Sequence, residues 1–328
     1  MLIRVLSFLC LAILAGPVAA CNGSDLRATL DADEKAHLAD QLDGMPFAIG
    51  NHWRATREGK TVHLVGTMHL ADQRLDGPVD RLRDIVRNAD LLLLEMTNKD
   101  EQAMQARLTS DPDFLLLSDT TLPELLSEDD WAQMSDALSA RGLPPFMAAR
   151  FQPWYVSMLL AIPPCADLDD LSSGGMDAQL ESIAEGAGVR RAALEDVETI
   201  FSAFTDQPRD MQIDMMLSAL VDSQVSEDMF ETLLAGYFDE ATAEGWAVSA
   251  LLAQRYSPIE PEAAADIFEI IEQQLLFDRN EAWIPVISDA SNEHNAIVVA
   301  FGAAHLPGEK GVLALLEAEG FAIERLPF

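Results

Sequence analysis

Apolar and polar residues recur with two different periods along this chain of 328 residues, and together they predict a mixed α/β fold. Short apolar runs predict strands, and two of them are joined by the turn Glu58-Gly59-Lys60 as in a hairpin. Residues 91–94 and 297–301 are continuously apolar, which is typical of strands buried on both faces of a sheet. The strands are expected at residues 53–56, 61–65, 91–94, 189–194, 297–301 and 321–326.

Helical spacing of apolar residues fills most of the remaining chain. A helix that starts at Asp76-Gly77-Pro78 would join the second and third strands as a βαβ unit. We expect N- and C-terminal βαβ-like segments to form one central sheet, with a large helical insertion over about 98–275, in a single domain of residues 21–328. Further helices are expected at residues 22–45, 151–162, 176–185, 208–235, 240–256, 261–283 and 307–319.

Residues 1–20 have the pattern of a signal peptide. Arg4 precedes an apolar run over residues 5–15, and Pro17-Val18-Ala19-Ala20 is a small-residue cleavage sequence. The apolar run is too short to span a bilayer comfortably, and no later stretch reaches that length. We therefore expect an exported protein, located in the periplasm or outside the cell.

The formal net charge of the chain is −34. A charge of this size repels nucleic acid and anionic lipid, so neither is an expected partner. It favours solubility and the accumulation of metal ions, and it gives no information on the fold.

Two cysteines remain after residues 1–20, and they allow two interpretations. Val18-Ala19-Ala20-Cys21 fits a lipobox, in which case a lipid on Cys21 would anchor the protein to a membrane. Alternatively, cleavage after Ala20 leaves Cys21 free to pair with Cys165 in an oxidising compartment. We favour the intramolecular disulfide, which would close a long loop.

Candidate chemistry lies at the ends of three predicted strands. Two of these strands end in Gly-x-x-His, as Gly66-Thr67-Met68-His69 and Gly302-Ala303-Ala304-His305, and the strand 91–94 ends in Glu95. Open α/β sheets place their ligands at the carboxyl edge of the strands. Two imidazoles and one carboxylate at that edge can hold a divalent metal with positions left open for water. The sequence therefore predicts a metal site of His69, Glu95 and His305.

Each of these residues also has a structural interpretation. A histidine at a strand end can simply cap it by hydrogen bonding, but two in matching positions with an acid nearby favour a site. Glu95 can be a metal ligand or the general base that deprotonates water, and the sequence does not separate these roles. Arg279 and Asn280 can clamp a substrate carboxylate or stabilise an oxyanion, and an exposed helical arginine beside acids is an equal alternative for Arg279.

Weaker signals come from the other histidines and acids. His63 lies within a strand and is interpreted as a packed or hydrogen-bonded strand residue. One of the acids Glu195, Asp196 and Glu198 can approach the same edge, because they end or follow a short strand. Surface positions are expected for His37, His52 and His294.

The strand-end motifs resemble those of the TraB/GumN family, which is related to the Tiki-type metalloproteases. The resemblance extends over roughly residues 45–328 and is carried by six blocks: Leu64-Val65-Gly66-Thr67-Met68-His69, Leu93-Leu94-Glu95, Gln152-Pro153-Trp154-Tyr155, Gly175-Met176-Asp177 with Leu194-Glu195-Asp196, Arg279-Asn280-Glu281-Ala282-Trp283, and Phe301-Gly302-Ala303-Ala304-His305-Leu306-Pro307-Gly308. It implies an α/β core with helical elaboration and ligand or catalytic roles for His69, Glu95 and His305. It also places Arg279 and Asn280 beside the site.

The resemblance also indicates the class of reaction. Tiki-type members cleave peptides with manganese or cobalt, so these metals are favoured, with zinc as a further option. We expect an exported metal-dependent hydrolase that acts on a peptide or protein. The alternatives are an envelope protein that binds a peptide or metal without turnover, and a scaffold in which the histidines only hold loops.

Overall fold

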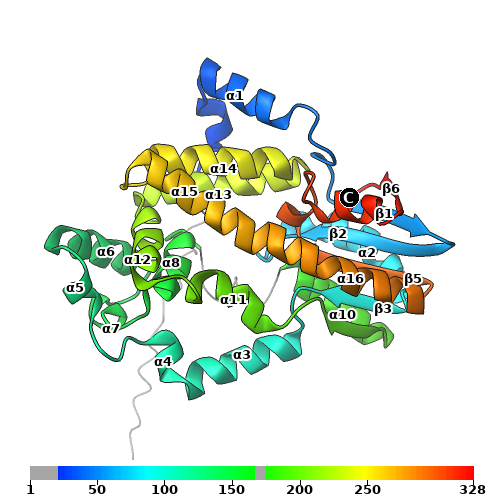
Figure 1. The fold of residues 1–328 in the computed structure, drawn as a ribbon, viewed down its shortest axis with the longest axis horizontal. Helices are drawn as coiled ribbons and strands as arrows, with labels where there is room; N and C mark the ends of the chain where they lie inside the picture. The colour runs from blue at the N-terminus through cyan, green and yellow to red at the C-terminus, as the bar shows by residue number, and fades with distance from the viewer. Residues whose placement is uncertain (1–20, 167–174) are drawn as a thin grey trace, which may run out of the picture.

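The computed structural model describes residues 21–166 and 175–328, so the predicted signal peptide 1–20 lies outside it. The strands form a six-stranded mixed sheet in the order β4-β3-β5-β2-β1-β6. This sheet lies on the right-hand side of Figure 1. The α/β fold predicted from the sequence is confirmed, and each predicted strand is found within a few residues of its expected bounds. The strands are β1 (His52–Arg57), β2 (Lys60–Thr67), β3 (Leu91–Leu94), β4 (Arg190–Ala193), β5 (Ala296–Gly302) and β6 (Ala322–Arg325).

The central strand of this sheet comes from the end of the chain. β5 pairs in parallel with β2 on one side and with β3 on the other, so it separates the two strands that α2 (Asp76–Arg87) connects. Because β5 lies between them, the strand that ends in Glu95 is not adjacent to the first Gly-x-x-His strand, although α2 connects the two directly. The β2–β1 and β1–β6 pairs are antiparallel and complete one side of the sheet.

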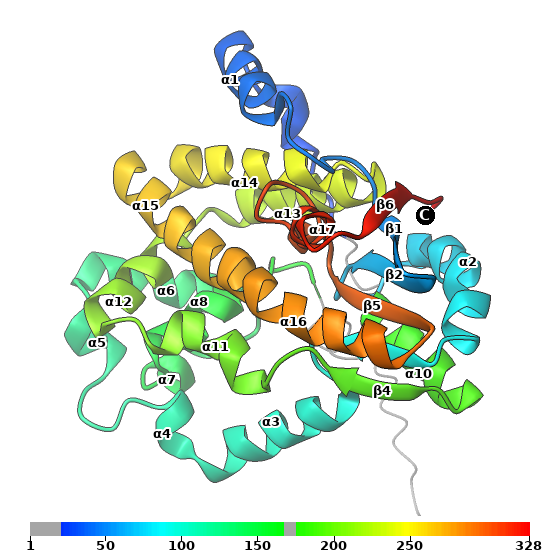
Figure 2. The same ribbon diagram turned by 45° about the vertical axis from the view of Figure 1, so that its right-hand side comes forward.

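Helices cover both faces of the sheet because the strand residues alternate between two apolar clusters. Val299 and Phe301 face one cluster with α16 (Asp278–Glu293) and α17 (Val312–Ala318). Val298 and Ala300 face the other, with α2 and α10 (Met176–Ala187). Figure 2 shows α16 along one side of β5, with α2 and α10 on the far side. The sheet is thus the middle of three layers.

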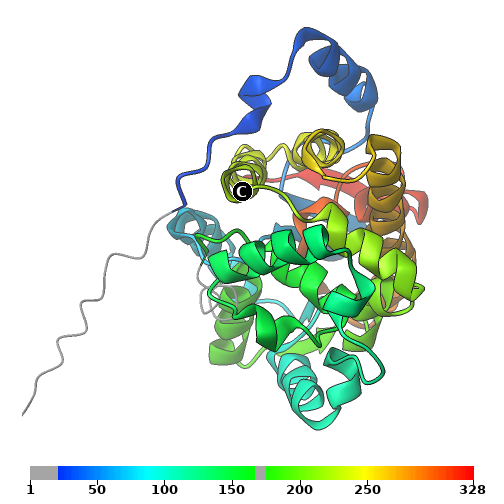
Figure 3. The ribbon, with the colours of Figure 1, turned by 90° about the vertical axis from the view of Figure 1, so that its left-hand side faces the viewer.

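Apart from α10, β4 and α16, the described part of the chain between β3 and β5 forms a helical region that lies to one side of the sheet (Figures 1 and 3). A separate apolar cluster holds part of this helical region together around Met134, Val156 and Met216. The helices of the whole helical region are α3 (Asn98–Ser110), α4 (Pro112–Leu115), α5 (Leu122–Leu125), α6 (Glu128–Ala140), α7 (Pro145–Ala148), α8 (Pro153–Ala161), α11 (Val197–Thr205), α12 (Arg209–Ser218), α13 (Ser223–Phe238), α14 (Thr242–Tyr256) and α15 (Pro261–Glu272).

Two long predicted helices differ from those observed. The helix expected over 208–235 is divided into α12 and α13, because Asp222 caps a new helix with its side chain on the Gln224 N–H. The helix expected over 261–283 continues to Glu293 through a π-helical segment, Gln273–Phe277. Pro285 does not end it; this proline lies on the exposed face, where water can reach the carbonyl that loses its partner.

The N-terminal segment is anchored to the helical region. Cys21 and Cys165 form a disulfide, as we favoured from the sequence, so the Cys21 sulfur is not free to carry a lipid. Leu26, Leu30 and Leu38 pack against α14 (Figure 3). The helix expected over 22–45 is instead a 3₁₀ turn, Leu26–Thr29, and α1 (Ala32–Leu42), because Asp31 begins a new helix with a capping box.

One histidine expected at the surface is buried. His52 is 3% exposed, because it lies on β1 opposite β2. Its Nε2 is 3.1 Å from His63 Nδ1 and its Nδ1 is 3.0 Å from the Pro327 carbonyl. The polar residues around it in the sequence gave no sign of this packing. His63 is a hydrogen-bonded strand residue, as predicted.

Among the described residues, no helix is both long and apolar enough to cross a membrane.

Candidate functional site

The sheet brings the three predicted strand ends to one edge. Thr67 of β2 pairs with Gly302 of β5, and Leu94 of β3 pairs with Ala300 of β5. All three strands run in the same direction, so the residues that follow them leave the sheet on the same side. His69, Glu95 and His305 therefore meet, although 236 positions separate the two histidines in the chain.

Glu95 lies at the centre of this group. Its Oε1 is 3.9 Å from His69 Nε2 and 3.8 Å from His305 Nε2. The Gly302 N–H donates to the same oxygen over 2.6 Å. A Cβ on Gly302 would lie 3.3 Å from both Glu95 Oε1 and His69 Nε2, so glycine keeps the centre of the site open. The geometry confirms that both Gly-x-x-His motifs and Glu95 converge.

The other nitrogen of each imidazole is held by an oxygen acceptor. His69 Nδ1 is 2.8 Å from Asp177 Oδ2, and the Thr67 hydroxyl donates to Asp177 Oδ1 over 2.6 Å. His305 Nδ1 is 2.6 Å from Asn280 Oδ1. Because both acceptors require an N–H at Nδ1, both Nε2 atoms are left to face Glu95.

Asn280 is oriented by a further hydrogen bond. Its Nδ2 donates to the Lys310 carbonyl over 2.9 Å, which directs its Oδ1 toward His305. The Asn280 side chain is buried, and it contacts the backbone and an imidazole. It acts on the site by fixing His305.

Charges in the site have opposite effects on the titrating groups. Burial favours neutral Glu95, but the imidazoles, the Arg279 guanidinium and the Gly302 N–H outweigh it and lower the Glu95 pKa to about 2. The charge of Asp177 raises the pKa of His69 to about 10, and this side chain is 60% exposed. Burial lowers the pKa of His305 to about 3. Glu95 is thus ionised and His305 neutral at pH 7.

Arg279 is buried and fully engaged, which differs from both sequence interpretations. Its Nη2 donates to Glu95 Oε2 and to Glu195 Oε1, each over 2.6 Å, and its Nε donates to Glu195 Oε1 over 2.8 Å. The guanidinium also lies over the Trp283 ring at 4.8 Å. Arg279 therefore neutralises two buried carboxylates and is neither an exposed helical residue nor a free clamp.

Glu195 approaches this edge of the sheet. It is one of the three acids, with Asp196 and Glu198, that the sequence offered as candidates for this position. It follows β4, the strand that pairs with β3, and burial raises its pKa while Arg279 opposes that change. Its contribution is to hold Arg279 beside Glu95.

The start of α10 is packed closely against the loop that carries His69. The Met176 N–H donates to the Met68 carbonyl over 2.8 Å. A Cβ on Gly175 would lie 2.5 Å from the backbone carbonyl atoms of His69, which no real structure tolerates without movement. Glycine at this position lets Asp177 reach His69.

Replacing Gly175 by alanine is expected to push the His69 loop away from α10 and to lower the free energy of unfolding by about 1–3 kcal/mol. Denaturant unfolding measures this change. Gly186→Ala is the matched control: it lies within α10 with open space at its Cβ position, so alanine there is expected to stabilise by about 0.5–1 kcal/mol. Equal effects of the two substitutions would contradict the role given to Gly175.

A cavity of about 440 Å³ opens above these residues. The strand-end residues form one side of it, and the helical region supplies the other with apolar and aromatic side chains, Leu233, Tyr237, Trp246 and Leu276. The Tyr237 hydroxyl donates to the Gly66 carbonyl over 3.1 Å, which ties α13 to the first Gly-x-x-His motif. The arrangement is a largely apolar binding cavity with a few convergent polar groups at one side.

A sequence model described as the TraB/PrgY/gumN family matches residues 51–325. The chain belongs to the TraB/PrgY/gumN family. This confirms the resemblance drawn from the strand-end motifs. No curated protein matches the chain significantly.

Sequence reasoning missed two parts of this TraB/PrgY/gumN site. It gave no role to Asp177 or Thr67, although Gly175-Met176-Asp177 was one of the blocks that carried the family resemblance. It also missed that Arg279 and Asn280 act on Glu95 and His305. The available signal was that Arg279 and Asn280 lie in the same turn of one helix. Their partners Glu95 and His305 come from distant parts of the chain, so the sequence did not show these contacts.

A divalent metal fits the donor set by its chemistry. Two Nε2 atoms and one carboxylate oxygen converge, and each imidazole has the oxygen acceptor at Nδ1 that commonly supports a ligating histidine. Two donors on one tetrahedral ion are about 3.4 Å apart, so the histidines and Glu95 would need to close by about 0.5 Å. As they stand, the described residues contain no group of three or more His, Cys, Asp or Glu side chains spaced to hold a metal ion.

Proposed function

We propose that this chain is an exported metal-dependent hydrolase, most simply a peptidase, with its metal held by His69, His305 and Glu95. The observation that carries the proposal is the approach of both Nε2 atoms to the single Glu95 oxygen, at 3.9 and 3.8 Å, beside the large cavity. Manganese and cobalt are favoured by the family resemblance, with zinc as a further option. The disulfide supports export, because such bonds persist in oxidising compartments.

The chain's own residues have separate tasks in this proposal. A divalent cation, when bound, would supply a Lewis acid that polarises a carbonyl and activates water near pH 7. Asp177 and Asn280 fix the orientation of the two imidazoles, and Asn280 holds neutral His305 with its proton on Nδ1. Glu95 is an anion at neutral pH, and its Oε1, the oxygen that Arg279 does not hold, can be either a metal ligand or the acceptor of a proton from water.

Arg279 takes a positioning role in this scheme. It fixes the Glu95 carboxylate and balances its charge, and Glu195 fixes Arg279 in turn. The apolar wall of the cavity would exclude bulk water from a bound peptide and strengthen these interactions.

Thermal unfolding with manganese, cobalt or zinc tests the metal site first. Metal at 100 times its dissociation constant is expected to stabilise the wild type by about 2.7 kcal/mol and to leave His69→Ala/His305→Ala unchanged. The control is His37→Ala/His294→Ala, since neither of these histidines lies in the site, and it should respond as the wild type does. A chelator should reverse the shift.

The other outcomes separate the alternatives. If wild type and the site variant shift equally, the metal binds elsewhere on the acidic surface. If neither shifts, a protein that binds peptides without turnover becomes the better interpretation. Where only the wild type shifts, a peptide-cleavage screen follows, and activity that persists in His305→Ala would overturn the proposed hydrolase.

A further inference from the structure

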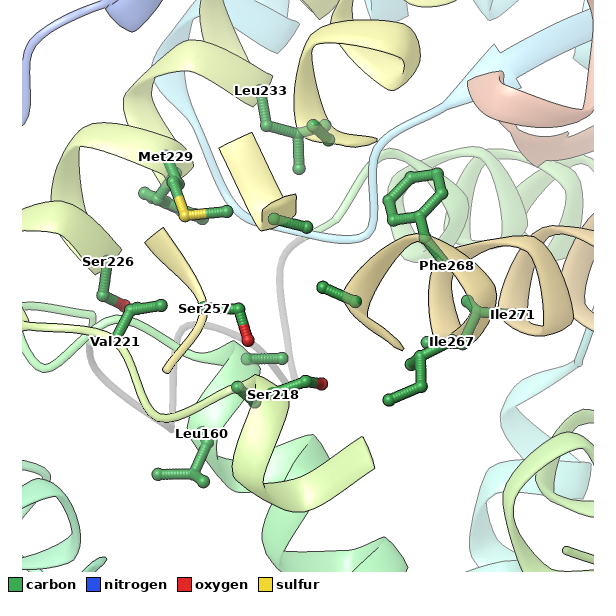
Figure 4. Close-up of a pocket in the computed structure, with 16 residues that line it drawn as sticks. Leu160, Ser218, Val221, Ser226, Met229, Leu233, Ser257, Ile267, Phe268 and Ile271 are labelled. Atoms are coloured by element: carbon green, nitrogen blue, oxygen red, sulfur yellow. The ribbon is translucent and has the colours of Figure 1, made fainter. Parts of the chain in front are cut away.

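A second chamber, of about 330 Å³, lies beside the cavity that contains the site residues. Leu233 of α13 lines both spaces, so they share a wall. Figure 4 shows this chamber, with Leu233 on one side and Phe268, Ile267 and Ile271 of α15 on another. Unlike the cavity beside the histidines, the chamber has no assigned role.

The same three helical segments line both spaces in succession. On α13 the lining passes from Met229 and Phe230 to Leu233 and then to Tyr237 of the active-site cavity. Along α14, which follows α13, the lining passes the other way with increasing residue number, from Trp246 of the active-site cavity to Ala253 of the chamber. Each of these segments thus lines the active-site cavity at one end and the chamber at the other, which indicates one groove that runs along the helices away from the site.

The third segment, α15 continuing into α16, sets the length of this groove. Phe268 and Ile271 line the chamber, and Arg279 lies beside Glu95. At 1.5 Å per helical residue, Phe268 is about 16 Å from Arg279 along the axis. An extended peptide covers that distance with about five residues.

The described residues that line the chamber are uncharged and mainly apolar. They include Leu160, Val221, Met229, Phe230, Ile267 and Phe268. Since a charged group would lose its hydration here without an opposite charge to compensate, the occupant must be neutral and largely apolar.

One polar group in the chamber lacks a partner. The hydroxyls of Ser218 and Ser249 donate to carbonyls of their own helices, at 2.7 and 2.8 Å. The Ser257 hydroxyl oxygen is buried, and it has no hydrogen-bond partner among the described residues. Because this oxygen has almost no accessible surface even with the chamber empty, it offers no hydrogen bond to an occupant, which again favours an apolar one.

We propose that this chamber is a specificity pocket of the active site, which takes a large apolar side chain of an extended peptide substrate about five residues from the cleaved bond. The inference rests on the proposed hydrolase function, because it places the peptide across both spaces.

The experiment uses decapeptides of glycine and serine in which one leucine is moved through every position. Cleavage by the metal-loaded wild type is measured by mass spectrometry. Binding to His69→Ala/His305→Ala is measured by fluorescence anisotropy with labelled peptides, so this second readout does not depend on metal or turnover. One leucine position is expected to improve both kcat/KM and Kd by roughly tenfold.

Ala253→Phe fills the chamber and is expected to abolish the leucine preference while cleavage of the leucine-free peptide persists. Ala250→Phe is the matched control, since Ala250 is half-buried on the same helix and lines neither space. If Ala253→Phe does not fold, Ile271→Ser provides a second variant, which makes the chamber polar.

Each result bears on one proposal only. A leucine preference that remains in both chamber variants overturns the specificity pocket, even where peptides are cleaved. Position-dependent binding that is lost in the chamber variants supports the pocket, even if no peptide is cleaved and the hydrolase proposal fails. Equal binding of all peptides, with tight binding of a free fatty acid instead, overturns the peptide assignment.

Discussion

Replacing Arg279 by alanine is expected to lower the free energy of unfolding by about 3–5 kcal/mol. Arg279 is 6% exposed and is paired with Glu95 and Glu195, so its removal leaves two buried carboxylates without their cation. Losing one partner of a buried pair costs far more than the pair itself contributes, because the remaining charge is not solvated. Denaturant unfolding monitored by circular dichroism measures the change.

Two further variants distinguish charge from packing at Arg279. Arg279→Lys keeps the charge but cannot donate to both acids in the same planar geometry, so an intermediate loss is expected. Adding Glu195→Gln to Arg279→Ala should recover part of the loss, since one uncompensated charge is removed. Arg83→Ala is the surface control, because the ion pair of Arg83 with Asp80 is exposed, and it should change stability by less than about 0.5 kcal/mol. A loss at Arg279 no larger than at Arg83 would contradict the buried pair.

Removing the Cys21–Cys165 disulfide is expected to cost about 5 kcal/mol on the loop-entropy relation for a sequence separation of 144 residues. The bond closes a loop that includes β1, β2, α2 and β3, so it restricts a large part of the unfolded chain. Cys21→Ser/Cys165→Ser should therefore unfold at lower denaturant concentration with an unchanged core. Unfolding curves with and without a reductant measure the effect.

The same substitution separates chain entropy from local contacts. The Leu26 N–H donates to the Thr232 hydroxyl over 2.8 Å, and Leu30 packs against α14, so the N-terminal segment keeps other contacts. Reductant should destabilise the wild type and leave the double serine variant unchanged. If reductant does not change the unfolding curve of the wild type, the disulfide does not stabilise the folded state, which would contradict this prediction.

The sequence alone determined the strands and the residues at their ends. Continuously apolar runs such as 91–94 and 297–301 are local signals, because burial on both faces requires apolar residues at successive positions. A histidine or acid that follows a strand lies at the edge of the sheet. The sequence alone was therefore enough to identify His69, Glu95 and His305 as residues at that edge. The disulfide was favoured because two cysteines remain in a chain that the sequence predicts to be exported.

The tertiary structure decided how these elements meet. β5 lies between β2 and β3, and no local pattern could show this, because strand order depends on contacts between distant segments. His52 was expected at the surface from its polar neighbours, yet the pairing of β1 with β2 buries it. Helix boundaries at Asp31 and Asp222 depended on side-chain caps that compete with continued helical spacing.

The same division holds within the site. The sequence supplied the groups that face the cavity, while only the fold supplied their partners. Asp177 reaches His69 because Gly175 allows close packing, and Arg279 reaches Glu95 and Glu195 because α16 crosses the sheet at β5. Hydrogen bonds and ion pairs between residues far apart in the chain leave no periodicity in the sequence, so their geometry is fixed by three-dimensional packing.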